Sequence, residues 1–216
     1  LQDYDRAVIL GSTTTGKGTA QVQLDSLAYG QATLTQRKFY RVTGGSTQNK
    51  GVIPDIKLVD IYDEEFGERK AKNALKWDTI PTAPFKREGS IQPYVAQLDQ
   101  KSKVRVSQDP QFQYLETRKA IAQETKDQKR ISLDIDKRKS ELVALEMKTL
   151  AAENKRRAAT GLKPYSNWES YQASLDALAE SRAKMKANQR PALPEEETFV
   201  NEAANVLLDM SHLKSK

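Results

Sequence analysis

The residue best suited to take part in a reaction is Lys17, which stands between two glycines in the run GSTTTGKG, residues 11–18. Gly16 and Gly18 remove side chains on both sides of the lysine, so backbone or substrate can approach it closely. A lysine acts as a general base only when it is neutral, and burial or a nearby cation must lower its pKa by about 3 units, at a cost of about 4 kcal/mol. The competing interpretation is a surface lysine in a glycine turn, and spacing alone favours that interpretation.

A lysine base would suit the rest of the composition. Serine–lysine enzymes dispense with histidine, and the one histidine of this chain, His212, lies near its end. A Ser-His-Asp triad or a multi-histidine metal site is therefore not expected. The lack of cysteine excludes a disulfide scaffold, a thiolate zinc site and a cysteine nucleophile. We expect neither a metal ion nor an organic cofactor.

The same run nearly matches the phosphate-loop pattern G-x-x-x-x-G-K-[ST]. The residue after Lys17 is Gly18, so the hydroxyl that would hold magnesium is absent, and Thr19 comes one residue late. A phosphate loop must also open a helix, whereas residues 18–24 (GTAQVQL) alternate polar and apolar, which predicts a strand. A nucleotide-binding function, which would need Lys17 and magnesium, is the least favoured of three hypotheses.

The elements that must position Lys17 lie in the first of three parts of the chain. Residues 1–61 hold seven of the ten glycines and predict short strands with tight turns, and the apolar run 7–10 predicts a buried strand. Residues 62–108 contain three prolines and predict an irregular connector. Trp77 and Phe85 within it indicate that the connector packs onto the core.

The third part, residues 109–216, has a helical pattern. Helix starts are indicated at Asp109-Pro110, after Asp136, at a capping box within residues 166–169 and at the acidic run 195–197. The helix after Asp136 should end at Gly161. Between the first two helices, Ile131, Leu133 and Ile135 alternate with polar residues, which predicts a short extended break. The apolar stripes of these helices are expected to pack as core rather than to bind a cofactor.

The net charge is +6, and residues 101–190 hold twenty Lys and Arg against twelve Asp and Glu. A basic helical arm of this kind could bind an anionic partner, so a helical interaction module is the second hypothesis. Interleaved acids and few aromatics favour a solvated surface, and we expect no nucleic-acid partner. No apolar run approaches the ~20 residues of a membrane-spanning helix, so the protein is not expected to be integral to the membrane.

Several stretches, in the right order, resemble the C-terminal processing, or tail-specific, proteases. Residues 11–21 are similar to that family's G-x-x-T-F-G-K-G-x-V-Q signature, and residues 40–46 and 51–55 are similar to its strand, turn and G-I-x-P-D segment. Residues 73–78 (NALKWD) and 109–112 (DPQF) resemble stretches of the long periplasmic members, which carry a helical C-terminal extension. The resemblance covers most of the chain.

The resemblance implies a serine endopeptidase with a Ser-Lys dyad that degrades or processes proteins recognised by their C-termini. In that family the lysine matching Lys17 is the general base, and the glutamine matching Gln21 helps to orient it. The nucleophilic serine would lie ahead of Leu1, so we expect this chain to be an inactive C-terminal fragment of a longer protein.

The fold implied is α+β, with the β-rich end of a Ser-Lys protease core followed by a mostly α-helical C-terminal domain. The division then becomes the end of the catalytic core over residues 1–61, a connector packed on it over 62–108 and a helical domain over 109–216. The expected partners are protein substrates with apolar C-termini and an adaptor protein, and the expected location is the bacterial periplasm or cell envelope.

Two departures from the family pattern and one geometric problem stand out. Thr15 replaces the usual phenylalanine, which removes an apolar wall near the lysine, and Ala20 replaces the usual valine. In a straight strand Lys17 and Gln21 would lie ~13 Å apart on one face, too far to touch. Their partnership therefore requires a bend or a helical turn, which Gly16 and Gly18 could permit.

Overall fold

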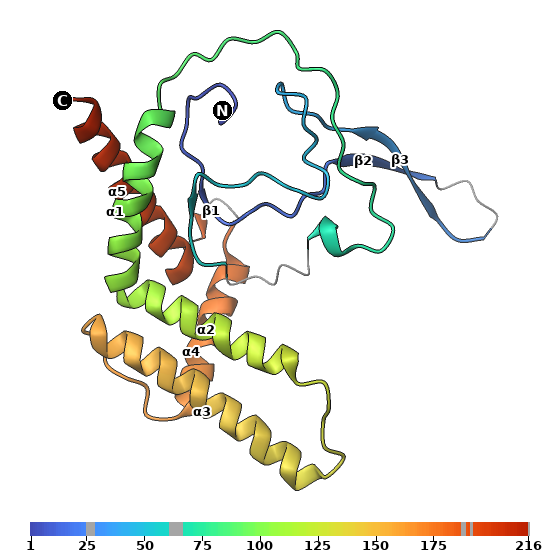
Figure 1. Ribbon diagram of the computed structural model, residues 1–216. Coiled ribbons are helices and arrows are strands. Elements are labelled where there is room, and N and C mark those ends of the chain that lie inside the picture. Colours follow the sequence, from blue (N-terminus) through green and yellow to red (C-terminus); the bar gives the residue numbers. More distant parts are fainter. Residues whose placement is uncertain (25–28, 61–66, 187–188, 191, 216) are drawn as a thin grey trace. The chain divides into compact units, whose positions relative to one another are not determined.

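A computed structural model describes residues 1–24, 29–60, 67–186, 189–190 and 192–215 of the chain (Figure 1). The chain divides into two compact units, one formed by Leu1–Gln100 with His212–Lys216 and the other by Lys101–Ser211. Within the described residues, all the strands belong to the first unit and most of the helical residues to the second. The predicted class, a small β part followed by a helical domain, is confirmed.

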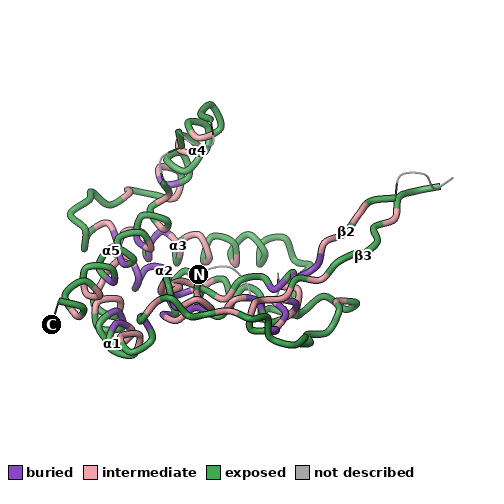
Figure 2. The backbone as a smooth tube through the Cα atoms, turned by 90° about the horizontal axis from the view of Figure 1, so that it is seen from above, coloured by how far each residue is buried: buried purple, intermediate pink, exposed green. Residues whose placement is uncertain are grey.

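The first unit has two pairs of short strands. β1 (Leu10–Gly11) pairs in parallel with β4 (Ile56–Lys57), and β2 (Thr19–Leu24) pairs antiparallel with β3 (Ala32–Lys38). β2 confirms the strand predicted from the period of two. The β2–β3 ribbon is exposed over most of its length (Figure 2).

The buried strand predicted over residues 7–10 is mostly wrong, because only Leu10 lies in a strand and the run is half-buried. Asp55 explains the difference. Its carboxylate accepts a hydrogen bond from the backbone N–H of Ile9 at 2.7 Å, and its own N–H donates to the Ile9 carbonyl at 2.7 Å. One aspartate thus satisfies backbone groups that a second neighbouring strand would otherwise pair.

Within the first unit, the connector around Trp77 and Phe85 packs onto the part that holds the strands, as these two residues indicated. The indole N–H of Trp77 donates to the Ser46 carbonyl at 2.8 Å, and the Lys50 ammonium lies 3.3 Å from the centre of the same ring. Phe85 meets Tyr4 edge to face, with ring centres 5.6 Å apart. These contacts hold a segment with little regular structure against the strand-bearing part of the unit.

The expectation of an irregular connector is wrong from Gln92 onward, where helix α1 (Gln92–Gln108) begins. Pro93, taken as a sign of irregular structure, stands in the first turn of this helix, where a missing N–H costs nothing. The helix start is capped from far away in sequence. The buried carboxylate of Asp5 accepts hydrogen bonds from the N–H groups of Ile91 and Gln92, both at 3.1 Å.

The second unit contains α2 (Pro110–Asp127), α3 (Ile135–Ala159), α4 (Trp168–Lys184) and most of α5 (Pro194–Lys214). The predicted cap at Asp109 is confirmed, since its side chain accepts from the Gln111 N–H at 2.7 Å. Gly161, with a φ of 74°, follows the end of α3 as expected.

Three local predictions in this unit need correction. The cap of α3 is Asp134, which accepts from two backbone N–H groups, so the helix begins before Asp136. The capping box of α4 joins Asn167 to Ser170, one residue later than predicted. Residues 128–134 separate α2 from α3 without helix or strand, so the predicted break is present, but it ends before Ile135, which already belongs to α3.

The apolar stripes of the second unit pack as core only in part, because Leu142 of α3, Leu175 of α4 and Leu207 of α5 are 56%, 40% and 63% exposed. Phe112 and Leu115 of α2 are each 1% exposed, and Phe112 meets Phe199 of α5 edge to face with ring centres 5.9 Å apart. Leu150 of α3 and Val206 of α5 are buried as well. Full burial of such side chains contributes about 1.5–3 kcal/mol each.

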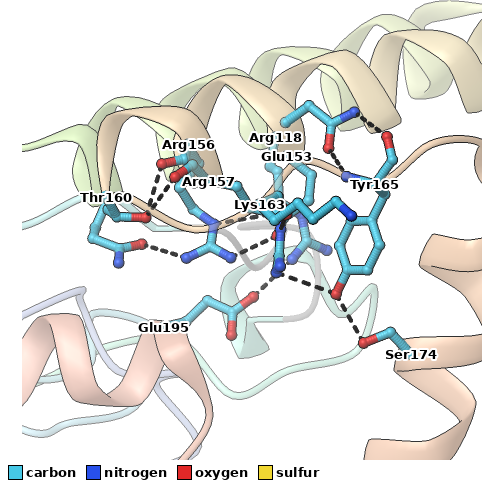
Figure 3. A network of polar contacts seen from close by, with 11 residues as sticks. Arg118, Glu153, Arg156, Arg157, Thr160, Lys163, Tyr165, Ser174 and Glu195 are labelled. Carbon is cyan, nitrogen blue, oxygen red and sulfur yellow. Dashed lines mark hydrogen bonds and ion pairs between the residues drawn. The ribbon is translucent and has the colours of Figure 1, made fainter.

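A polar network also joins helices of this unit (Figure 3). The Arg156 guanidinium pairs with Glu153 at 2.6 Å on α3 and donates to Gln111 of α2 at 3.0 Å. Beside it, Arg118 of α2 pairs with Glu195 of α5 at 2.8 Å. The network therefore ties three helices of the unit together with charged groups that satisfy one another.

A second set of ion pairs joins the part of α1 in this unit to α5. Arg105 contacts Glu202 at 2.8 Å and Asp209 at 2.6 Å, and Lys101 also contacts Asp209 at 2.6 Å. Burial acts to raise the pKa of Asp209, but the hydrogen bonds from Lys101 and Arg105 outweigh it and lower that pKa. None of the helices in the described residues is both long and apolar enough to cross a membrane.

Candidate functional site

Lys17 lies in the loop between β1 and β2, which is held by a second loop, residues 45–51. The Asn49 N–H donates to the Gly16 carbonyl at 2.8 Å, and the Gly18 N–H donates to the side-chain oxygen of Gln48 at 2.8 Å. Gln48 is fully buried. The backbone on both sides of Lys17 is therefore fixed by hydrogen bonds to residues about thirty positions away.

The two glycines are required by the close approach of that second loop. A β-carbon on Gly18 would stand 2.4 Å from the Gln48 backbone nitrogen, and one on Gly16 would stand 2.9 Å from the Asn49 carbonyl oxygen. Gly16 also has a φ of 79°, which side chains rarely tolerate. Within the described residues, neighbouring backbone fills the space that the glycines leave beside Lys17.

The Lys17 amine has two polar partners in the described part of the chain. Its Nζ donates to Oε1 of Gln21 at 2.9 Å and to Oγ1 of Thr19 at 3.2 Å. The Gln21 amide nitrogen donates in turn to Oγ1 of Thr35 on β3 at 3.1 Å. A row of side chains therefore runs from the lysine across the β2–β3 ribbon.

The structure brings Lys17 and Gln21 together because the segment is not a straight strand. β2 begins at Thr19, so Lys17 lies in the loop before it. Between Ala20 and Gln21 the pairing with β3 shifts by one residue, which leaves Gln36 without an opposite partner. Such a bulge re-aims side chains along the ribbon. The contact exists, and the catalytic roles of the two residues stay a prediction.

Lys17 and Gln21 are both exposed among the described residues. Thr15, which replaces the family's phenylalanine, is exposed too, and its carbonyl accepts from the Glu68 N–H at 2.7 Å. The apolar wall that the resemblance would place beside the lysine is therefore not supplied by Thr15.

The segment after Lys17 also bears on the nucleotide-binding hypothesis. Residues 19–24 form β2, and no helix starts within residues 18–24. The N–H groups that a phosphate loop gathers at a helix start are thus missing at this point. The chemistry that this arrangement supports is that of an oriented amine.

Three residues of the site were missed by sequence reasoning. Thr19 was weighed only as a misplaced magnesium ligand, and Thr35 could have been found only from the register of a hairpin with a bulge. Gln48 shows no signal in the sequence, because its role depends on a buried position between Gly18 and Glu68, whose carboxylate accepts from the Gln48 amide at 2.9 Å.

A further polar cluster, near the end of β3, has a structural role. The Lys38 ammonium pairs with Asp78 at 2.8 Å, and the Tyr40 hydroxyl donates to the other oxygen of that carboxylate at 3.2 Å. The hydrogen bond from Lys38 lowers the pKa of Asp78. Partial burial, followed by the hydrogen bond to Asp78, raises the pKa of Tyr40. The cluster ties the ribbon to the connector.

Comparison with known families divides the chain near residue 60. Residues 1–58 match the model of peptidase family S41, and residues 61–212 match the model described as the C-terminal domain of tail specific protease. The second match alone covers more than half of the chain.

Two relatives carry the same descriptions. The chain is 41% identical over 154 residues to the "Tail-specific protease" of Haemophilus influenzae, a match that covers 65% of this chain and 22% of the relative. It is 32% identical over 83 residues to the "Carboxy-terminal-processing protease" of Bartonella bacilliformis, covering 35% of this chain and 19% of the relative. The matched stretches thus span about a fifth of each relative's length.

Proposed function

Since this chain belongs to the tail-specific protease family as a C-terminal part of such a protein, we propose that Lys17 is the general base of a serine endopeptidase. The observation that supports the proposal is the contact between the Lys17 amine and the Gln21 amide oxygen at 2.9 Å. It pairs the two residues that the family signature singles out, although a straight strand would separate them.

The proposed reaction uses the neutral amine of Lys17 to remove the proton of a serine hydroxyl. The serine belongs to a part of the parent protein outside this chain, so the chain alone is inactive. The serine oxygen attacks the scissile carbonyl carbon, and the resulting ammonium returns the proton to the leaving amine as the acyl-enzyme forms. Water, deprotonated by the same amine, then releases the carboxylic acid and restores the serine.

The base must be neutral at working pH, and the described residues leave Lys17 exposed. The apolar surface that would desolvate the amine must therefore come from the rest of the protease core or from bound substrate. The role of Gln21 in this proposal is to orient the amine, since its amide oxygen can only accept hydrogen bonds.

The proposed substrates are proteins selected by apolar C-termini, in the bacterial periplasm or cell envelope. The names of the relatives, which describe tail-specific and carboxy-terminal-processing proteases, support selection by the C-terminus, whereas the apolar preference and the location are carried over from the family resemblance. The division into a catalytic-core end over residues 1–61, a packed connector over 62–108 and a helical domain over 109–216 belongs to the same proposal.

A second candidate function for the helical unit is the docking of an adaptor or of the protease core. The segment before α3 favours it, because Leu133 is 99% exposed and Ile131 and Ile135 are each more than 60% exposed. Leu133→Asp in the full-length protein should weaken co-purification of an adaptor while leaving cleavage of a short peptide unchanged. Unchanged co-purification would exclude this segment as the docking site.

The decisive test of the protease proposal compares the full-length parent protein with its Lys17→Ala variant. The readout is degradation of a folded reporter ending in an apolar tail, beside the same reporter with a charged tail. We expect wild type to remove only the apolar-tailed reporter and Lys17→Ala to remove neither. Lys57→Ala, which changes an exposed lysine on β4, is the matched control. Full activity of a folded Lys17→Ala protein would show that Lys17 is a turn residue.

A further inference from the structure

We propose that Thr19 and Thr35 are positioning residues, which together aim the lone pair of the neutral Lys17 amine. The inference rests on the proposed function, because a lone pair has to be aimed only if Lys17 is a base. It goes beyond that function by naming two hydroxyl groups, one on each strand of the ribbon, that fix how the base points.

A neutral primary amine carries two N–H groups and one lone pair. In the described part of the chain, Nζ of Lys17 has two acceptors, Oε1 of Gln21 at 2.9 Å and Oγ1 of Thr19 at 3.2 Å. When both N–H groups are engaged, the lone pair is left with one direction, which is set by the two acceptors. With only Gln21 in place, the amine could still rotate about that hydrogen bond.

Thr19 is held firmly at the start of β2. Its residue is 7% exposed, and it opens β2 opposite Lys38 of β3. A β-branched side chain in a strand has few accessible χ1 rotamers, so the position of its hydroxyl oxygen is fixed by the backbone. The backbone just before it is fixed as well, because the Gly18 carbonyl accepts from the Phe39 N–H at 2.7 Å.

Gln21 is exposed and has a flexible side chain. Its terminal amide can present either its oxygen or its nitrogen to Lys17, but a lysine amine that donates needs the oxygen. Oγ1 of Thr35 accepts from the amide nitrogen at 3.1 Å, which engages the nitrogen and leaves the oxygen facing Lys17. The bulge at Gln36 places Thr35 opposite Gln21. Thr35 thus acts on the base through Gln21, and Thr19 acts on it directly.

The test uses the full-length parent protein and a peptide substrate for which kcat and KM are measured separately. Thr19→Val and Thr35→Val remove each hydroxyl at nearly constant shape, whereas Thr19→Ser and Thr35→Ser keep it. We expect Thr19→Val to lower kcat by about tenfold or more and Thr35→Val by a smaller factor, with KM unchanged. The serine variants should restore most of the loss. Thr33→Val, on the same exposed strand opposite Gln23, should match wild type.

The outcomes separate this inference from the function on which it rests. An active Lys17→Ala protein would remove the proposed function itself. An inactive Lys17→Ala protein together with wild-type kcat in both valine variants would overturn only the positioning roles. Equal losses in the valine and serine variants, or a loss that appears in KM, would also overturn them. Should Thr19→Val fail to fold, as judged by its thermal unfolding, Thr19→Ala removes the same hydroxyl and answers the question.

Discussion

In the first unit, Gln48 and Asp5 fix backbone groups that lie 30 and 87 residues away in the sequence. In the second unit, Asp109 and Asn167 fix helix starts only two or three residues away. The first unit contains short strands and long irregular segments, so single side-chain contacts hold its loops. The second unit contains helices whose backbone groups satisfy one another along each element.

The candidate base lies in the first of these two units. Lys17 stands in the unit whose loops are held by single hydrogen bonds between residues far apart in the sequence. In the helical unit, packed apolar faces and several ion pairs together hold the helices in place. A change in one nonlocal contact of the first unit should therefore cost more than a comparable change in the second.

The largest effect is expected for Gly18→Ala. The new β-carbon would stand 2.4 Å from a backbone nitrogen of Gln48, and backbone cannot move aside as a flexible side chain can. We expect a loss of about 3 kcal/mol in the free energy of unfolding, measured by urea denaturation with tryptophan fluorescence. Gly45→Ala is the control, because its nearest neighbour is the Trp77 ring at 3.8 Å. Equal free energies of unfolding for Gly18→Ala and Gly45→Ala would contradict this prediction.

A somewhat smaller loss is expected for Arg105→Met in the second unit. Glu202, 3% exposed, would lose its partner, although Lys101 still contacts Asp209. We expect about 2 kcal/mol, below the usual cost of breaking a buried pair because the guanidinium is partly exposed. Lys184→Met breaks an exposed pair with Glu180 and should change the free energy of unfolding by less than about 0.5 kcal/mol. A larger loss for Arg105→Met than for Gly18→Ala would reverse the ranking of the two units.

Removing one local cap should cost less again. Asp109→Ala deletes the side chain that accepts from the Gln111 N–H at 2.7 Å, and caps of this kind contribute about 1 kcal/mol. Thermal unfolding followed by circular dichroism would measure the change. Glu116→Ala, at an exposed position within α2, is the matched control and should have little effect. If both variants unfold at the temperature of wild type, the local caps add nothing to the stability of the helical unit.

The smallest effect is a pH dependence that arises from Asp209. Burial acts to raise the pKa of Asp209, but the hydrogen bonds from Lys101 and Arg105 outweigh it. The pKa of Asp209 is therefore lower in the folded protein than in the unfolded chain. Its contribution to stability is therefore complete above about pH 4 and is lost as the pH falls through the folded pKa. Asp209→Asn should unfold with a flatter dependence on pH below 4. The same slope in wild type and variant would contradict this assignment.

The helical unit was largely predictable from the sequence because its signals are local. Asp109-Pro110 and Gly161 marked helix ends where the structure has them. The starts of α3 and α4 were misplaced by one or two residues, since several neighbouring polar side chains there can serve as the cap. The break predicted over residues 131–135 lies between α2 and α3, but Ile135 already belongs to α3 because the Asp134 side chain caps that helix.

The first unit was less predictable because its structure depends on contacts between residues far apart in the sequence. Nothing near residues 7–10 indicates that Asp55 will occupy the place of a neighbouring strand. A proline such as Pro93 is common both in the first turn of a helix and in a loop. The hydrogen bonds to the distant Asp5 carboxylate show that a helix starts here, and nothing near Pro93 in the sequence indicates them. Of the candidate site, the sequence pointed to Lys17 and Gln21 through a family signature, whereas Thr35 depends on a bulge that the sequence does not reveal.

The cap that Asp5 places on α1 also has a consequence for the order in which the chain folds. The helix cannot complete its first turn from residues nearby, because its cap comes from 86 residues away, and closing so long a loop carries an entropic cost. The helices of the second unit need no such closure. They should therefore form early, whereas the first turn of α1 forms together with the long-range pairing of β1 and β4, as the slow step of the first unit.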